Sequence, residues 1–198
     1  MNINSQFEYL INPISKEDFF DNYFEKNYLL IQNRNKDYYN EVLNINDIDT
    51  VLSSEKIPVA NIQMSKKAPI THEAWSKLIR LKGIHVDLEK ISNGLDNGNS
   101  LILNNFNKFE EKLGNFVNQL QEEILSGLWA NIYITPAFFQ AFKRHYDTHD
   151  VFVMQIKGEK HWKLYETPIP LPHRTQSNNK FKFDLESMTP IKEILLKE

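Results

Sequence analysis

Residues 145–162, HYDTHDVFVMQIKGEKHW, decide how the fold of this 198-residue chain is interpreted. The stretch holds three of the six histidines, with an aspartate two residues after the first of them. Residues 150–158 and 160–166 are strand-like segments that flank Gly158 and Glu159, which predicts a hairpin with a tight turn. The stretch is therefore either an ordinary amphipathic strand pair or a metal and cosubstrate site.

The first half of the stretch carries the candidate metal ligands. Residues i and i+2 of a strand point to the same face, so His145 and Asp147 would present an imidazole nitrogen and a carboxylate oxygen side by side. These are two of the three ligands of the two-histidine, one-carboxylate triad that holds Fe(II) and leaves positions open for substrates and O₂. A surface ion pair gives the same pattern, so that alternative stays open.

The second half of the stretch adds a cation, Lys160, fifteen residues after His145. If this side chain points into a barrel, its ammonium needs an anion, because burying an unpaired charge is costly. A dicarboxylate cosubstrate would neutralise it and could chelate the metal with its other end. If the side chain points outward, it is simply solvated beside the turn. The pattern does not choose between the two orientations.

The remaining sequence predicts helices followed by strands. Helical apolar spacing indicates helices over residues 19–26, 46–52, 86–95 and 109–128, the first opened by a capping pair of Ser15 and Asp18. β-rich segments indicate strands over residues 28–32, 57–64, 100–104, 129–135 and 181–185, with a loop over 167–179. This order favours an α+β fold with a mainly antiparallel sheet or barrel.

Composition narrows the class of protein. The apolar share of 41% and the charged share of 25% are typical of a globular domain. The formal charge of −3 gives no reason to expect binding to DNA or to an anionic membrane, and no apolar stretch is long enough to span a bilayer. The chain has no cysteine, so any metal site must use His, Asp and Glu. The beginning of the chain has no signal-peptide pattern, and we expect a cytoplasmic location.

Residues 131–165, NIYITPAFFQAFKRHYDTHDVFVMQIKGEKHWKLY, resemble the JmjC-type, cupin-fold 2-oxoglutarate oxygenases. The nearest group is the ribosomal oxygenases, which hydroxylate His or Arg side chains of ribosomal proteins. NYFEKNYLLIQ, at residues 22–32, resembles an N-terminal segment of that group. The resemblance implies a single domain over residues 1–198. Residues 1–128 would form its helical and β N-terminal part, and 129–198 the first part of a jelly-roll core, a double-stranded β-helix.

The resemblance also implies a role for each matched residue. His145 and Asp147 would bind Fe(II), Lys160 would bind the C5 carboxylate of 2-oxoglutarate, and Asn131 and Tyr133 would line the cosubstrate and substrate pocket. The implied reaction uses O₂ and hydroxylates a protein side chain, with a ribosomal protein as the expected substrate. His149 and His161 are expected not to be ligands.

Two departures from the family pattern leave alternatives open. Phe138 and Phe139 stand where the family usually has small residues, so the substrate mouth is expected to be narrowed or reshaped. The distal His ligand of the family belongs to a later strand that we do not find, so we expect a truncated chain with two protein ligands and an incomplete barrel. The alternatives are a non-catalytic cupin-like binding module, and an oxygenase acting on a peptide or an RNA-linked small target. The sequence gives no basis for a dimer.

Overall fold

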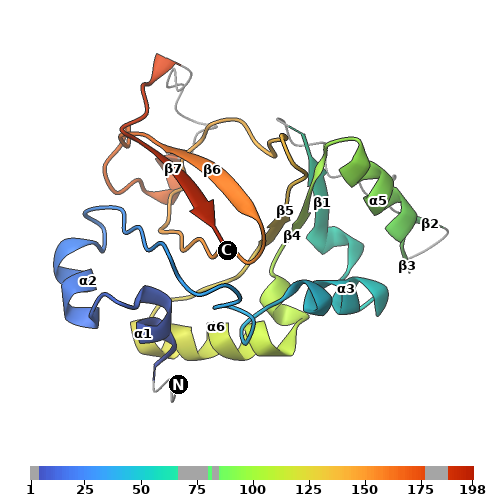
Figure 1. Cartoon of the computed structure of the whole chain (residues 1–198), viewed down its shortest axis with the longest axis horizontal. Helices are drawn as coiled ribbons and strands as arrows, with labels where there is room; N and C mark the ends of the chain where they lie inside the picture. Colours follow the sequence, from blue (N-terminus) through green and yellow to red (C-terminus); the bar gives the residue numbers. More distant parts are fainter. Residues whose placement is uncertain (1–4, 67–79, 82–84, 177–186) are drawn as a thin grey trace. The chain divides into compact units, whose positions relative to one another are not determined.

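The computed structural model describes residues 5–66, 80–81, 85–176 and 187–198. The chain divides into two compact units (Figure 1). The first contains Met1–Asn40 and Arg144–Glu198, and the second contains Glu41–Lys143. No helix in the described ranges has the length and apolar character needed to cross a bilayer.

The first unit opens with two short helices, α1 (Gln6–Ile11) and α2 (Lys16–Asn22). The hydroxyl of Ser15 accepts a hydrogen bond from the backbone N–H of Asp18 at 3.0 Å, so the predicted start of α2 is confirmed, although the helix ends earlier than expected. Phe7 of α1 and Phe19 of α2 meet edge to face with ring centroids 5.1 Å apart. Phe152 packs against both rings, at 6.5 and 6.1 Å.

The strands of the first unit are β6 (Glu159–Leu164) and β7 (Lys192–Lys197), which pair antiparallel along their whole length (Figure 1). The predicted hairpin of residues 150–158 with 160–166 is therefore wrong, and residues 150–156 carry no strand. Phe152 packs into the aromatic cluster of α1 and α2 instead of facing β6. Gly158 does adopt the left-handed backbone of a turn, at φ +70°, but its N–H donates to the carboxylate of Glu198.

The predicted strand over residues 28–32 is also wrong. These residues do not form a strand, and Tyr28 is exposed. The side-chain amide of Gln32 donates to the carbonyl of Leu195 on β7 at 3.2 Å, so a side chain rather than a backbone ladder joins this segment to the sheet. A short 3-10 helix, η3 (Arg174–Gln176), lies within the predicted loop. The strand expected over 181–185 lies outside the described residues.

The second unit is built on a three-stranded antiparallel sheet in the order β1-β4-β5. All four residues of the central strand, β4, are buried. The strands of this sheet are β1 (Ile62–Ser65), β4 (Ser100–Leu103) and β5 (Ile132–Ile134), and a two-residue pair joins β2 (Arg80–Leu81) to β3 (His85–Val86). The helices are α3 (Ile45–Ser53), α5 (Leu88–Asp96) and α6 (Glu111–Ile124), with 3-10 turns η1 (Val59–Asn61) and η2 (Phe106–Lys108).

Sequence periodicity located these helices well. The predictions over 46–52, 86–95 and 109–128 are confirmed as α3, α5 and α6, with ends displaced by a few residues. The apolar stripe of α6 is buried at Leu113, Phe116 and Leu120, as its spacing of three and four residues requires. All described strand pairings are antiparallel, which confirms the mixed α+β class.

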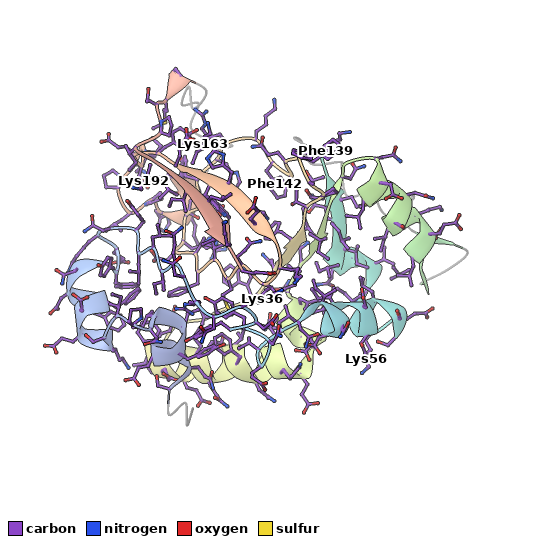
Figure 2. All side chains as sticks on the ribbon, in the orientation of Figure 1. Lys36, Lys56, Phe139, Phe142, Lys163 and Lys192 are labelled. Atoms are coloured by element: carbon purple, nitrogen blue, oxygen red, sulfur yellow. The ribbon has the colours of Figure 1, made fainter. Side chains whose placement is uncertain are left out.

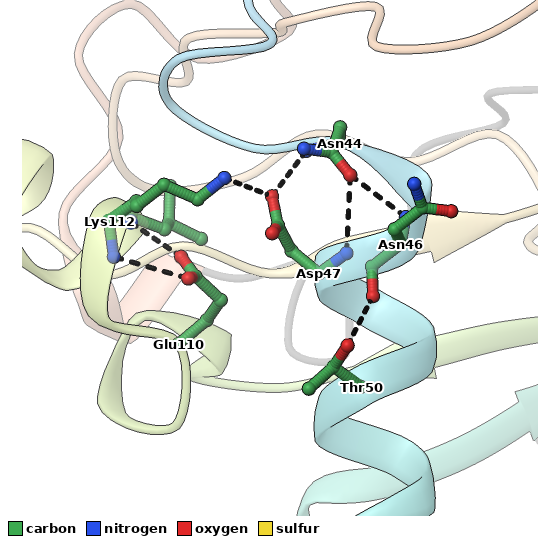
Figure 3. Close-up of polar contacts among 7 residues, drawn as sticks. Asn44, Asn46, Asp47, Thr50, Glu110 and Lys112 are labelled. Atoms are coloured by element: carbon green, nitrogen blue, oxygen red, sulfur yellow. Dashed lines mark hydrogen bonds and ion pairs between the residues drawn. The ribbon is translucent and has the colours of Figure 1, made fainter.

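The start of α3 is fixed by a network of polar contacts (Figure 3). The side chain of Asn44 accepts hydrogen bonds from the N–H groups of Asn46 and Asp47, and the Asp47 carboxylate accepts the N–H of Asn44 in return. The same carboxylate forms an ion pair with Lys112 of α6 at 2.7 Å, and this hydrogen bond raises the pKa of Lys112. Glu110 caps α6 by accepting the N–H of Leu113. The two helix starts are thus linked by one carboxylate.

We expect Asn44→Ala to lower the free energy of unfolding by about 1 kcal/mol, because the first N–H groups of α3 lose their acceptor. The melting temperature should fall by about 2–4 °C, measured by circular dichroism. Asn46→Ala is the matched control, since Asn46 is exposed in the same turn and its side chain makes no capping bond. Equal melting temperatures for the two variants would contradict the capping role.

Candidate functional site

The β6–β7 ladder has two chemically different faces. The outer face carries exposed charged side chains: the Glu193 carboxylate lies 3.1 Å from Lys163 Nζ and 3.0 Å from His161 Nε2. Figure 2 labels Lys163 of β6 and Lys192, the first residue of β7. We call the opposite side the inner face. Five of its residues are half-buried or buried, namely Lys160, Trp162, Leu164, Ile194 and Leu196, and the sixth, Lys192 opposite Leu164, is exposed.

Lys160 belongs to the inner face, directly opposite Leu196 in the register. Its side chain is half-buried, and this burial lowers the pKa of its ammonium from 10.5. Among the residues that the structure describes, no carboxylate forms an ion pair with it. Lys160 is therefore half-buried on the side of β6 opposite to the exposed side chains of His161 and Lys163.

His145 and Asp147 lie in a segment without regular secondary structure, so the strand assumed for them is not present. Exposure nevertheless alternates along this segment. His145, Asp147 and His149 are exposed, whereas the residue before each of them, Arg144, Tyr146 or Thr148, is half-buried. Within ranges 5–66, 85–176 and 187–198, no three His, Asp or Glu side chains are placed to hold a metal together.

Two side chains, those of Arg144 and Tyr146, hold the backbone around His145. The Arg144 guanidinium lies 4.1 Å from the centroid of the Tyr165 ring and donates to the carbonyl of Met188 at 3.1 Å. The Tyr146 hydroxyl donates to the carbonyl of Gln176 at 2.5 Å. The half-buried side chains of Arg144 and Tyr146 thus anchor the segment, and the candidate ligands occupy exposed positions next to these anchors.

Asn131 and Tyr133 belong to the second unit, whereas His145, Asp147 and Lys160 belong to the first. The Oδ1 atom of Asn131 accepts the backbone N–H of Asn105 at 3.0 Å, which leaves the side-chain NH₂ as its remaining polar group. Asn105 has a left-handed backbone, at φ 52°. Tyr133 lies on β5 and is 45% exposed, with its ring edge to face with Phe142 at 6.2 Å.

The same turn explains why β5 is shorter than the predicted strand over 129–135. The N–H of Ala130 donates to the side chain of Asn107 at 3.0 Å, and its carbonyl accepts the N–H of Phe106 at 2.8 Å. The backbone of residue 130 is therefore bonded to the turn after β4 instead of to a neighbouring strand. The asparagines at positions 104, 105 and 107 are the one sequence signal that could have indicated this turn.

The two phenylalanines that depart from the family pattern have different environments. Phe139 (Figure 2) packs over Gly98, where a Cβ would lie 2.3 Å from its ring, and the ammonium of Lys66 lies 4.9 Å from the ring centroid. Phe138 is fully exposed and has a left-handed backbone, at φ 66°. One ring is thus part of the packing of the second unit, and the other projects into solvent.

The sequence pattern did not predict one polar feature of the inner face, the indole N–H of Trp162. Trp162 is half-buried on the inner face, and its indole Nε1 is buried without a hydrogen-bond acceptor among the described residues. Alternation along β6 places it on the same face as Lys160. That shared face was the available signal, but the residue type suggested packing alone.

Known proteins resemble most of this chain. The JmjC domain model matches residues 102–198. A bifunctional lysine-specific demethylase and histidyl-hydroxylase NO66 from Aedes aegypti is 33% identical over 96% of this chain and 29% of its own length. Ribosomal oxygenase 1 from Danio rerio is 29% identical over 82% of the chain and 29% of its own length. Ribosomal oxygenase 2 from Bos taurus is 28% identical over 83% of the chain and 36% of its own length.

The chain thus spans about a third of the length of these relatives. The JmjC match covers β5, the segment of His145 and Asp147, and both strands of the β6–β7 ladder. These similarities confirm the resemblance derived from residues 131–165: residues 102–198 match a JmjC domain, and the chain is similar to proteins of the ribosomal-oxygenase group.

Proposed function

We propose that this protein is an Fe(II)- and 2-oxoglutarate-dependent oxygenase that hydroxylates a protein side chain. The observation that carries the proposal is the half-buried ammonium of Lys160 on the inner face, which has no carboxylate partner among the described residues. A cation in this environment is stabilised by an anionic ligand. The names of the relatives, histidyl-hydroxylase and ribosomal oxygenase, support the reaction class.

Lys160 would bind the carboxylate of 2-oxoglutarate that lies farthest from the metal. The apolar neighbours Leu164, Ile194 and Leu196 lower the local dielectric constant, which strengthens the attraction between ammonium and carboxylate. A ligand that neutralises Lys160 removes the cost of its burial at the same time. The inner face thus provides a selective site for an acid with a second carboxylate.

His145 and Asp147 would supply one imidazole nitrogen and one carboxylate oxygen to the metal. This donor set fits Fe(II), and the chain has no thiolate that would favour a softer metal. When bound, Fe(II) supplies the activation of O₂. The role of the protein is to hold the two ligands in place, through the anchored side chains of Arg144 and Tyr146, and to orient the cosubstrate through Lys160.

Asn131 and Tyr133 would contact the cosubstrate or the substrate. Because Asn131 Oδ1 is already bonded to Asn105, its side chain would act as a hydrogen-bond donor through its NH₂ group. The relatives named ribosomal oxygenases support a ribosomal protein as substrate. The name histidyl-hydroxylase supports a His side chain as the hydroxylated group, and an Arg side chain is the alternative that the family resemblance implies. We place the protein in the cytoplasm as part of the same proposal.

Removing either metal ligand should abolish turnover. We expect His145→Ala and Asp147→Ala to reduce 2-oxoglutarate-dependent succinate formation by at least about 100-fold, because loss of a ligand exceeds the effect of losing an outer hydrogen bond. The measurement uses the intact protein with Fe(II), O₂ and ribosomal protein extract. His161→Ala is the matched control, since His161 lies on the outer face and pairs with Glu193.

Unchanged turnover in His145→Ala would contradict the proposed metal site. Binding of 2-oxoglutarate by the unmodified protein without any succinate formation would instead identify a non-catalytic binding module.

Replacing the Lys160 ammonium should stabilise the free protein while removing cosubstrate binding. Burial lowers the pKa of Lys160, so between that lowered pKa and 10.5 the folded protein binds fewer protons than the unfolded chain, and stability increases with pH in this window. At neutral pH the burial cost is fully present, and Lys160→Met should therefore raise the melting temperature. 2-Oxoglutarate at about 100 times its Kd should raise the free energy of unfolding of the unmodified protein by about 2.7 kcal/mol. It should leave the free energy of unfolding of the variant unchanged.

Differential scanning calorimetry with and without 2-oxoglutarate measures both effects. Lys163→Met is the matched control, because Lys163 lies on the same strand but forms an exposed ion pair with Glu193. Equal stabilisation of Lys160→Met and Lys163→Met by 2-oxoglutarate would contradict the assigned role of Lys160.

A further inference from the structure

We propose that the indole N–H of Trp162 is a second donor to the carboxylate that Lys160 binds, an inference that rests on the proposed function. The two residues would form a paired donor site on the inner face, with the ammonium supplying the charge and the indole fixing the orientation of the carboxylate. The ligand class is a dicarboxylate such as 2-oxoglutarate.

The first support is the unmet hydrogen-bonding capacity of Trp162. Its Nε1 atom is buried, and no described residue accepts its hydrogen. A buried N–H without an acceptor costs free energy, so such groups are rare in folded proteins and call for a specific explanation. The opposing residue on β7 is Ile194, which offers only an apolar side chain.

The second support is the position of Trp162 two residues after Lys160 on one face of β6. Alternate residues of a strand lie about 6.6 Å apart along its axis, a separation that two long side chains can close. A carboxylate has two oxygens and about four lone-pair positions, so it can accept from an ammonium and an indole together. Of the other residues on this face, Leu164, Ile194 and Leu196 cannot donate, and Lys192, which lies opposite Leu164 at the end of the ladder, is exposed.

The third support is a comparison with the outer face of β6, where the polar side chains have partners. His161 and Lys163 both meet Glu193 there, within 3.1 Å. On the inner face, by contrast, the indole N–H of Trp162 has no acceptor among the described residues. Lys160, on the same face, has no carboxylate partner among them. Two donors that lack acceptors on one face indicate one shared acceptor, supplied by a ligand.

The direct test observes the indole N–H itself. The intact protein is labelled with ¹⁵N-tryptophan and loaded with diamagnetic Zn(II) in place of iron, and the Trp162 indole signal is assigned by its loss in Trp162→Phe. We expect addition of 2-oxoglutarate to shift this signal, whereas 2-oxopentanoate, which has the same five-carbon chain but no second carboxylate, leaves it in place. The indole of Trp129, which is 52% exposed, serves as the internal control.

Binding measurements extend the test to energetics. Loss of a charge-assisted hydrogen bond should weaken 2-oxoglutarate binding to Trp162→Phe by about 10- to 100-fold, measured by calorimetric titration. Binding of 2-oxopentanoate should be weakened much less, because it lacks the carboxylate that the indole contacts. This comparison between ligands separates a lost hydrogen bond from a general disturbance of the fold.

The outcomes distinguish this inference from the function on which it rests. If 2-oxoglutarate binds and Lys160→Met abolishes that binding, but the Trp162 signal does not shift, Trp162 is not a ligand donor and the proposed function stands. Equal weakening of both ligands by Trp162→Phe also overturns the inference. If 2-oxoglutarate does not bind at all, both proposals fail.

Discussion

The constraint on which this site depends is the solvation of one ammonium group. Lys160 lies half-buried beside apolar residues of β6 and β7, where its charged form is disfavoured and its pKa is lowered. Nothing in the packing of the inner face requires a lysine, since a leucine or methionine would fill the same position at lower cost. A residue that destabilises the free protein in this way is best explained by a ligand that neutralises it.

The sequence predicted the elements that depend on local pattern. Helical spacing located α6 and the capping residues located α2, because helix formation and capping are governed by neighbours within four residues. Strand pairing was predicted poorly. The two strand-like segments around Gly158 predicted a hairpin, but β6 pairs with β7, about thirty residues later, while Phe152 joins the aromatic cluster of α1 and α2. No local signal reports such a partner.

The candidate site, too, was predicted only in part from the sequence. The spacing of fifteen residues between His145 and Lys160, together with the family resemblance, identified the residues to consider, and strand alternation separated Lys160 from His161. The orientation of Lys160 could not be read from the pattern, because inward and outward positions alternate equally well until the partner strand is known. The donor in Trp162 and the bond that fixes Asn131 Oδ1 to Asn105 required coordinates, since both depend on which atoms find partners.

The most direct measurement of this account is the pKa of the Lys160 side chain, followed by NMR of its labelled ε-carbon as pH is raised, with and without 2-oxoglutarate. The account predicts a pKa below 10.5 in the free protein and a higher pKa in the complex, because the bound carboxylate stabilises the ammonium. Lys163, exposed on the outer face of β6, is the reference signal. A pKa for Lys160 at its ordinary value in the free protein, unchanged by 2-oxoglutarate, would contradict the account.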